Sequence, residues 1–424
     1  MTSSISTSPV ERNGPTRIWT TLVEFVQPVL APFLLSRFCV LVTAVLLEWL
    51  LDSGRAFRYD FIGQAPLATL SATFDANWYG DIAANGYSTS PDVTIQQNYQ
   101  FRPLYPLLMR VLGMVLGLDH VQGGYNIAGV LLSHIFFLAA LALFYWLTVD
   151  YWGDATIAKY SVWTMALLPW AFVFSMTYTE ALFLLISLAA MSLAFWQRHH
   201  PGLGAVVTIA VLIACAALTR PQGVILVLPA ILLVAMTPRT IPKVARLRNA
   251  AIIIIAAVAA GAGFMVYVGM ITGNAWSSLQ VNSTWGRGWL HDMTRLLVLP
   301  PANPAWSVDV ITTTGLFIWL YLLIRMLQKT VDSQRTVSPG PSDGWSVRWA
   351  FPIYSVAYFV FTAGAIPMNT SWGRYMLVVF PCVWVVAAIA QRLTKRISAK
   401  VLLSGAVALQ MLLFSSAIIL QVTP

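Results

Sequence analysis

The sequence has little charge for its length. Asp, Glu, Lys and Arg make up 10% of its 424 residues, whereas a soluble globular protein carries about 25%. Hydrophobic residues make up 58%, and the mean hydropathy is +0.72. A chain with so few charges along its whole length cannot cover its surface with groups that prefer water. The scarcity therefore excludes an ordinary soluble domain and predicts a protein surrounded by lipid.

Cysteine is also scarce. Cys39, Cys215 and Cys382 all lie inside apolar stretches, which argues against a disulfide framework or a zinc site. No cleavable signal peptide is recognisable, and the polar residues 1–27 read as a cytoplasmic tail before the first span. An internal repeat is also missing, which weakly disfavours a transporter built from inverted halves.

Long apolar runs dominate what remains, and they predict an all-α, polytopic transmembrane bundle in one domain, 1–424. A membrane span needs about 20 apolar residues. We expect about eleven spans, near Pro28–Leu51, Asn126–Thr148, Lys159–Met176, Tyr178–Gln197, Leu203–Thr219, Pro221–Thr237, Ala250–Ile271, Trp306–Leu327, Trp349–Ile366, Ser371–Ala390 and Lys400–Leu420.

The basic residues indicate the orientation of these spans. Clusters at Arg239–Arg248, Arg325–Arg348 and Arg392–Lys400 fall in alternate loops, which is the positive-inside pattern rather than a nucleic-acid-binding face, despite the net charge of +9. We therefore expect a cytoplasmic N-terminus and a large first outer loop, residues 52–125, bearing interfacial helices. This topology holds only if Leu104–Leu118 is re-entrant or interfacial, which its short length and the nearby prolines favour.

Candidate chemistry concentrates in the first outer loop. The stretch Phe74–Tyr87 reads F-D-A-N-W-Y-G-D-I-A-A-N-G-Y. On a helix, Asp75 shares a face with Trp78 and Tyr79, whereas Asp81 falls on the more polar side.

Asp75 has two interpretations. A carboxylate on an apolar face is costly unless it is paired or used, and desolvation raises the pKa of such a group toward the range of a general base. Alternatively, Asp75 is the N-cap of this helix, a position that aspartate fills well. The two roles can coexist, and the pattern leaves both open.

A second stretch, Gln100–Leu108, combines prolines, aromatic rings and one arginine. Arg102 suits pairing with the phosphate of an isoprenoid lipid, and rings such as Tyr105 suit contact with that lipid. The competing interpretation is an arginine that reaches from an interfacial helix to the headgroups.

Further polar residues lie at the outer ends of later spans: Tyr178, Glu180, Arg220, Arg374 and Tyr375. Each one alone is well explained as an interfacial anchor. Their convergence on the side of the first loop suggests function, because charges buried in membrane proteins tend to be functional.

These residues carry a family resemblance. The matching stretches keep one order along the chain: Phe74–Tyr87, Phe101–Pro106, Tyr178–Leu188, Arg220–Gly223 and Arg374–Tyr375. Together they resemble the PIG-V-like mannosyltransferases of the GT-C superfamily. Two departures are visible: Phe74 stands where Trp is commoner, and Arg102 stands where the family often has Phe.

The resemblance implies a GT-C bundle that acts as a hexosyltransferase. It implies inverting transfer of mannose from a polyprenyl-phosphate carrier to a glycolipid or similar acceptor on the non-cytoplasmic face, with no metal or other cofactor. By position Asp75 is the base, with Asp81 as runner-up. Substrate contacts are expected from Trp78, Tyr79, Arg102, Tyr105, Tyr178, Glu180, Arg220, Arg374 and Tyr375.

Two other functions stay open. One keeps the superfamily but uses a different polyprenyl-phosphate sugar. The other is a transporter or flippase of lipid-linked sugars, for which Arg37 and Glu48 are the charges within a span. The location favoured is a bacterial plasma membrane, or the endoplasmic reticulum in a eukaryote. The sequons at Asn282 and Asn369 do not decide between them.

Overall fold

The computed structural model describes residues 16–52, 67–237, 241–285, 306–336, 344–365 and 371–419. Every regular element within these ranges is helical. Arg239, the sequon at Asn369 and residues 1–15 of the expected tail lie outside the described residues.

The described part of the bundle is built from α1 (Thr16–Asp52), α5 (Gly124–Trp152), α6 (Ala155–Leu167), α7 (Glu180–Trp196), α8 (Leu203–Thr219), α9 (Val227–Ile231), α10 (Lys243–Thr272), α13 (Trp306–Thr336), α14 (Trp345–Ala365), α15 (Trp372–Leu377), α16 (Phe380–Leu393) and α17 (Ala399–Ile419). Between the long helices lie α2 (Ala68–Ser71), α3 (Asp75–Asn85), α4 (Leu104–Val115) and α11 (Ser277–Gln280). Single turns are the 3-10 elements η1 (Asn98–Gln100), η2 (Ala171–Ser175), η3 (Pro221–Leu226) and η5 (Val281–Trp285) and the π-helical η4 (Leu232–Met236).

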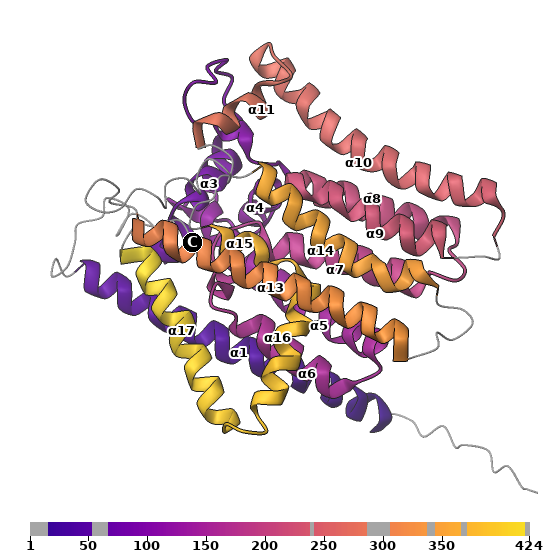
Figure 1. The fold of residues 1–424 in the computed structure, drawn as a ribbon. Coiled ribbons are helices and arrows are strands. Elements are labelled where there is room, and N and C mark those ends of the chain that lie inside the picture. The colour runs from indigo at the N-terminus through magenta and orange to yellow at the C-terminus, as the bar shows by residue number, and fades with distance from the viewer. Residues whose placement is uncertain are drawn as a thin grey trace, which may run out of the picture.

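Helix α7 forms the centre of the bundle. Its sequence is apolar all round, and thirteen of its 17 residues are buried, as expected for a helix enclosed by others. It packs against α5 and α8, and α10 covers α8. On the other side α16 packs against α6 and α13, and α1 packs against α6 and α17. Figure 1 shows the resulting bundle, with α3 at the upper left, α11 at the top and the first turns of α10 at the right.

The expected spans are all largely helical, but several are broken. Within the described ranges, four helices have the length and hydropathy of a membrane span: Gln27–Leu51, Gly124–Trp152, Lys243–Thr272 and Ala399–Ile419. The expected segment Lys159–Met176 is not one helix, because α6 ends at Leu167. Pro169 explains the break, since it disfavours helical geometry at Leu168, whose ψ is 145°. The count of eleven spans stays a prediction.

The region whose crossing was in question forms α4. Its 12 residues extend about 18 Å, against the about 30 Å of a hydrocarbon core. Tyr105 and Met109 are buried on one face, whereas Leu107 and Val111 are exposed on the other. A short helix with this division suits an interfacial or re-entrant position, as the first-loop prediction requires.

Candidate active site

Helix α3 presents the candidate base. It begins at Asp75 and follows Phe74, whose φ of +51° lies in a region that residues other than glycine rarely adopt. The N-cap is therefore Phe74, whose side chain makes no cap bond. The interpretation of Asp75 as N-cap is wrong, because Asp75 is the first residue of the helix itself. Its carboxylate pairs instead with the buried Arg374.

Close packing fixes the position of α3. Gly80 lies against Asn126 of α5 so tightly that an added Cβ would stand 1.9 Å from the Asn126 Oδ1. The Asn126 amide donates to the Ser71 carbonyl at 2.6 Å, just before α3. Because α5 is a long buried helix, this contact ties the first loop to the rigid bundle.

The two candidate aspartates have different surroundings. Asp81 accepts from the Asn85 and Asn98 side-chain amides at 2.9 and 2.8 Å, and Asn98 also binds the Ser88 N–H and the Gly86 carbonyl. Asp81 thus holds the end of α3 to the following loop. The predicted division of the helix into an inner face with Asp75 and a polar face with Asp81 is confirmed.

Asp75 begins a chain of ion pairs that joins four elements. Its Oδ2 lies 2.7 Å from Nη2 of Arg374 in α15. Nε of Arg374 lies 3.1 Å from Oε1 of Glu180, the first residue of α7. The same oxygen lies 2.5 Å from Nη1 of Arg220, between α8 and η3. Residues spread over 300 positions of sequence therefore meet at one point, which we name the four-charge network: Asp75, Glu180, Arg220 and Arg374.

Aromatic rings enclose the network. The Tyr375 ring contacts both guanidinium groups, at 4.8 Å for Arg220 and 5.0 Å for Arg374. The Tyr178 ring lies 4.8 Å from the Arg374 guanidinium, and its buried hydroxyl has no hydrogen-bond partner among the described residues. Cation–π contact and exclusion of water both strengthen the charge–charge contacts.

The network is nearly dry and formally neutral. Side-chain exposure is 2% for Glu180, 5% for Arg374 and 6% for Arg220, but 13% for Asp75. Two positive and two negative charges balance, which buried charges require. Asp75 is the most exposed of the four.

Tyr79 and Thr179 extend the network toward the loop. The Tyr79 hydroxyl lies 3.4 Å from the Thr179 Oγ1, which also accepts from Arg220 Nη1 at 3.2 Å. Burial, reinforced by the negative charges of Asp75 and Glu180, raises the pKa of the Tyr79 phenol, so the ring stays neutral. Thr179 belongs to the polar group Tyr178–Glu180 and to the family stretch Tyr178–Leu188, but it was not among the expected substrate contacts.

Arg102 lies apart from the four-charge network. Its guanidinium sits 4.6 Å from the Phe264 ring of α10, and its Nε and Nη1 are buried without a hydrogen-bond partner among the described residues. Burial lowers the pKa of Arg102. A cation held this way can accept an anionic partner, because its hydrogen-bonding capacity is unused.

The remaining predicted contacts form the wall between Arg102 and the network. Trp78 stacks on Phe101 with centroids 6.0 Å apart, and Tyr79 meets Phe101 edge-on at 5.1 Å. Tyr105 is fully buried, and its hydroxyl bonds the Gly129 carbonyl at 2.9 Å and Ser133 at 2.8 Å. Among the described residues no group of three His, Cys, Asp or Glu side chains is placed to hold a metal ion.

Comparison with solved structures identifies the fold. The chain matches the oligosaccharyltransferase of Archaeoglobus fulgidus, tethered to an acceptor peptide, with a TM-score of 0.51 and 11% identity over 93% of this chain. It spans about half of that enzyme, 55% of its length. ArnT from Cupriavidus metallidurans bound to undecaprenyl phosphate matches with a TM-score of 0.48 and 13% identity, over 90% of this chain and 76% of ArnT. No curated protein sequence matches the chain.

A family model matches more specifically. The model described as Mannosyltransferase (PIG-V) covers residues 30–266, which include Asp75, Arg102, Glu180 and Arg220. These residues make up more than half of the chain. The protein therefore belongs to the mannosyltransferase (PIG-V) family, and its fold is of the GT-C type.

Proposed function

We propose that the protein transfers mannose from a polyprenyl-phosphate-mannose donor to a glycolipid or similar acceptor, with inversion and with Asp75 as the general base. The observation that carries the proposal is the pairing of Asp75 with Arg374 in a dry network whose most exposed member is the carboxylate. In the reaction, the acceptor oxygen forms a bond to the anomeric carbon while the bond from that carbon to the phosphate oxygen breaks. The hydroxyl proton goes to Asp75, and the polyprenyl phosphate leaves.

One carboxylate is sufficient for this chemistry. A phosphate leaves as a stable anion and needs no strong acid, unlike the leaving group in glycoside hydrolysis, which usually needs a second carboxylate. Glu180 is bound by both Arg220 and Arg374, so we assign it to holding the two cations rather than to proton transfer. The proposal requires no metal ion or organic cofactor.

Cations supply the remaining electrostatic help. The unpartnered Nε and Nη1 of Arg102 suit the donor phosphate, and Arg374 is close enough to stabilise negative charge near Asp75. The ring wall of Trp78, Phe101 and Tyr79 separates the two cations and suits an isoprenoid or sugar face. Tyr105, by contrast, is assigned to supporting Tyr79, whose ring lies 5.5 Å away.

The transporter hypothesis receives less support. Arg37 donates to Ser175 Oγ at 2.8 Å and to the Ala171 carbonyl at 3.1 Å. Glu48 accepts from the Thr69 N–H and hydroxyl at 2.9 and 2.8 Å. Both charges within α1 therefore have fixed partners that join it to neighbouring segments, which favours a structural role.

The decisive experiment uses purified protein in detergent with short-chain polyprenyl-phosphate mannose and extracted membrane glycolipids. We expect a mannosylated product, with the opposite anomeric configuration to the donor. A panel of glucose, arabinose and other pentose carriers tests the sugar, and a product from one of these alone would replace mannose in the proposal. Release of donor from liposomes without any transfer would support the transporter instead.

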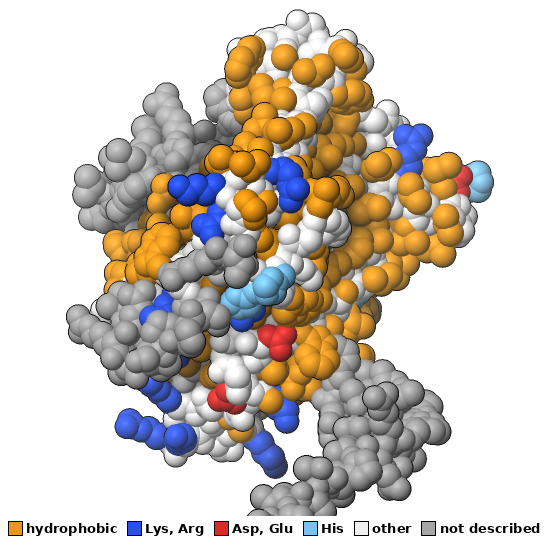
Figure 2. Space-filling view, turned by 90° about the vertical axis from the view of Figure 1, so that its right-hand side faces the viewer, with side chains coloured by type: hydrophobic (Ala, Val, Ile, Leu, Met, Phe, Trp, Pro, Cys, Tyr) orange, Lys and Arg blue, Asp and Glu red, His pale blue; other side chains and the backbone are white. Residues whose placement is uncertain are grey.

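We also propose that the N-terminus is cytoplasmic and that the four-charge network faces the opposite side. Exposed Lys243 and Arg248 lie in the first two turns of α10, and exposed Lys395 and Arg396 lie in the turn between α16 and α17. Figure 2 shows Lys and Arg spread over the side of the molecule that lies at the right in Figure 1. Membrane-impermeant labelling of a cysteine introduced at Ser90 in the first loop tests the orientation. Labelling only after the cytoplasmic side is opened would reverse it.

A further inference from the structure

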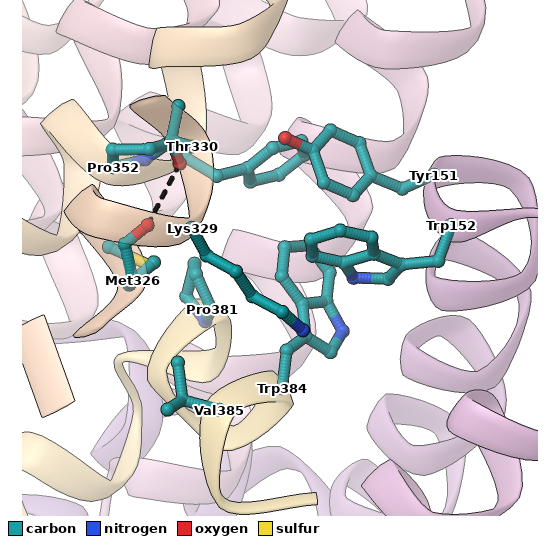
Figure 3. Close-up of a pocket in the computed structure, with 10 residues that line it drawn as sticks. Tyr151, Trp152, Met326, Lys329, Thr330, Pro352, Pro381, Trp384 and Val385 are labelled. Carbon is teal, nitrogen blue, oxygen red and sulfur yellow. Dashed lines mark hydrogen bonds between the residues drawn. The ribbon is translucent and has the colours of Figure 1, made fainter. Parts of the chain in front are cut away.

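A second site lies at the opposite end of the bundle from the four-charge network. Helix α5 runs between the two: Gly129 near its start binds Tyr105, and Trp152 is its last residue. Its 29 residues extend about 43 Å. The hollow at this far end is formed by the ends of α5, α13, α14 and α16 (Figure 3).

Aromatic rings and one lysine form the wall of the hollow. Tyr151 stacks on Trp384 with centroids 5.0 Å apart, and Trp152 meets Trp384 edge-on at 5.7 Å. Figure 3 shows Lys329 extending toward these indoles, and its Nζ lies 5.1 Å from the Trp152 ring. Tryptophan beside lysine is the combination that membrane proteins carry at the headgroup level.

Lys329 is the cation that lines the hollow among the described residues, and two arginines lie near it. Burial, together with the positive charges of Arg392 and Arg325, lowers the pKa of Lys329, so the three cations are near enough to repel one another. In the part of the chain that the structure describes, none of the three forms an ion pair with a carboxylate.

The carboxylates near the α5–α6 turn are already occupied. Asp150 accepts from the Trp196 indole at 2.6 Å, and Asp154 caps α6 through the Thr156 and Ile157 N–H groups. Because no described acid compensates the three cations, an anion from outside would lower the energy of this end.

An apolar surface leads away from these cations along α13. Ile318, Tyr321 and Arg325 follow one another at helical spacing, and Lys329 continues the line one turn further. Ile318 and Tyr321 are more than half exposed. A surface that is apolar over two turns and then cationic matches a molecule with a hydrocarbon chain and an anionic head.

We propose that this hollow binds the headgroup phosphate of an anionic phospholipid, held by Lys329, Arg325 and Arg392, with one acyl chain along Ile318 and Tyr321. Basic pockets between transmembrane helices are a recognised way to hold such headgroups. A phospholipid suits the site better than an acidic peptide, because a peptide would not cover the exposed apolar turns. The lipid would bridge α13 and α16, which both contribute side chains to the hollow.

The test measures binding of phosphatidylglycerol, cardiolipin and phosphatidylcholine to the full-length protein in detergent by native mass spectrometry. The double variant K329Q/R392Q removes two cations, and the matched control K395Q/R396Q removes two from the neighbouring α16–α17 turn. Each cation near a membrane surface contributes about 1 kcal/mol, which is about fivefold in affinity. We expect K329Q/R392Q to weaken phosphatidylglycerol binding about 25-fold, and K395Q/R396Q to leave it within about twofold.

Several outcomes would overturn the proposal. Equal losses in the two double variants would indicate a diffuse field rather than a site, and equal binding of phosphatidylcholine would remove the role of the headgroup charge. Displacement by glycerol 3-phosphate or by an acidic peptide at lipid concentrations would identify a soluble ligand. If K329Q/R392Q does not fold, Lys329→Gln alone, expected at about fivefold weaker binding, and Lys329→Arg, expected near the wild-type value, replace it.

Discussion

The two ends of the bundle differ in whether their charged side chains are buried and paired. At the loop end, two acids and two arginines are almost completely buried and compensate one another. At the far end, Arg325, Lys329 and Arg392 are exposed and have no described acidic partner. A dry, neutral network holds charged groups in fixed positions, as catalysis requires. An exposed set of like charges instead creates a field that attracts anions and orients the chain.

The largest expected effect of a substitution is at Asp75, in the four-charge network. If this carboxylate is the base, Asp75→Asn should lower transfer by about a thousandfold, because general-base catalysis contributes about 10²–10⁴. Asn keeps the size of the side chain but removes one carboxylate from Arg374, so the free energy of unfolding should also fall, by less than in Glu180→Gln because Asp75 is more exposed and Arg374 keeps Glu180. Initial rates with purified protein and a short-chain donor check this.

Asp81→Asn is the matched control for Asp75. It keeps shape and removes charge on the same helix, but Asp81 only binds Asn85 and Asn98. We expect transfer within about threefold of wild type, since a net hydrogen bond contributes about 1 kcal/mol. A large loss in Asp81→Asn with an active Asp75→Asn would exchange the roles of the two aspartates.

The second prediction concerns a variant that removes one negative charge from the four-charge network. Glu180→Gln leaves Arg220 and Arg374 buried with one carboxylate between them. Removing one partner from a buried ion pair costs about 3–5 kcal/mol, so the free energy of unfolding should fall by that amount and transfer should fall with it. Denaturation in detergent measures the change.

A matched change at the far end provides the contrast. Arg392→Gln removes an exposed cation of α16 that has no described acidic partner, so the free energy of unfolding should change by less than about 1 kcal/mol. Equal destabilisation by Glu180→Gln and Arg392→Gln would contradict the distinction between the two ends.

The third prediction separates Arg102 from the network. Arg102→Met keeps much of the apolar stem over Phe264 but removes the guanidinium. If that group binds the donor phosphate, KM for the donor should rise about tenfold, since a hydrogen bond to a charged group contributes about 1.5–3 kcal/mol. Steady-state kinetics against donor concentration measure it. Arg110→Met on the exposed side of α4 should leave KM unchanged, and an equal rise in both variants would favour the membrane-anchor interpretation of Arg102.

The smallest expected effect on the transfer rate is that of a substitution at the far end of the bundle. Lys329→Gln changes a residue that α5 separates from Asp75, so the transfer rate in detergent should stay within about twofold, given the screening of charges over such distances. The same assay as for Asp75→Asn measures it. A tenfold loss of transfer rate in Lys329→Gln would mean that the two ends of the bundle are coupled, for example by a shared conformational change.

The family motifs also explain one glycine. Gly223 ends the Arg-x-x-Gly stretch, and an added Cβ would stand 2.2 Å from the backbone of Ala216 and Ala217 in α8. Only glycine lets η3 fold back against the end of α8, and this fold aims Arg220 at Glu180. The motif is therefore a packing requirement as much as a functional one.

The sequence by itself determined the class of the protein. Low charge and long apolar runs required a helical membrane bundle, because backbone groups in lipid must bond within their own segment. The helical periodicity of α3 was sufficient to place Asp75 and Asp81 on different faces of the helix, since side chains on one helix follow a fixed geometry. Two predictions from the sequence were wrong for local reasons. Lys159–Met176 is not one helix because Pro169 ends α6 at Leu167, and the N-cap of α3 is Phe74, one residue before Asp75.

Only the tertiary structure decided what Asp75 contacts. Asp75, Glu180, Arg220 and Arg374 lie on four segments, and no spacing in the sequence says that one arginine will bridge the two acids. The same holds for Lys329 and Trp152, which meet because α13 and α5 end at the same side. Such contacts depend on which helices pack together, and apolar helices in a bundle can exchange neighbours without any change in their own pattern.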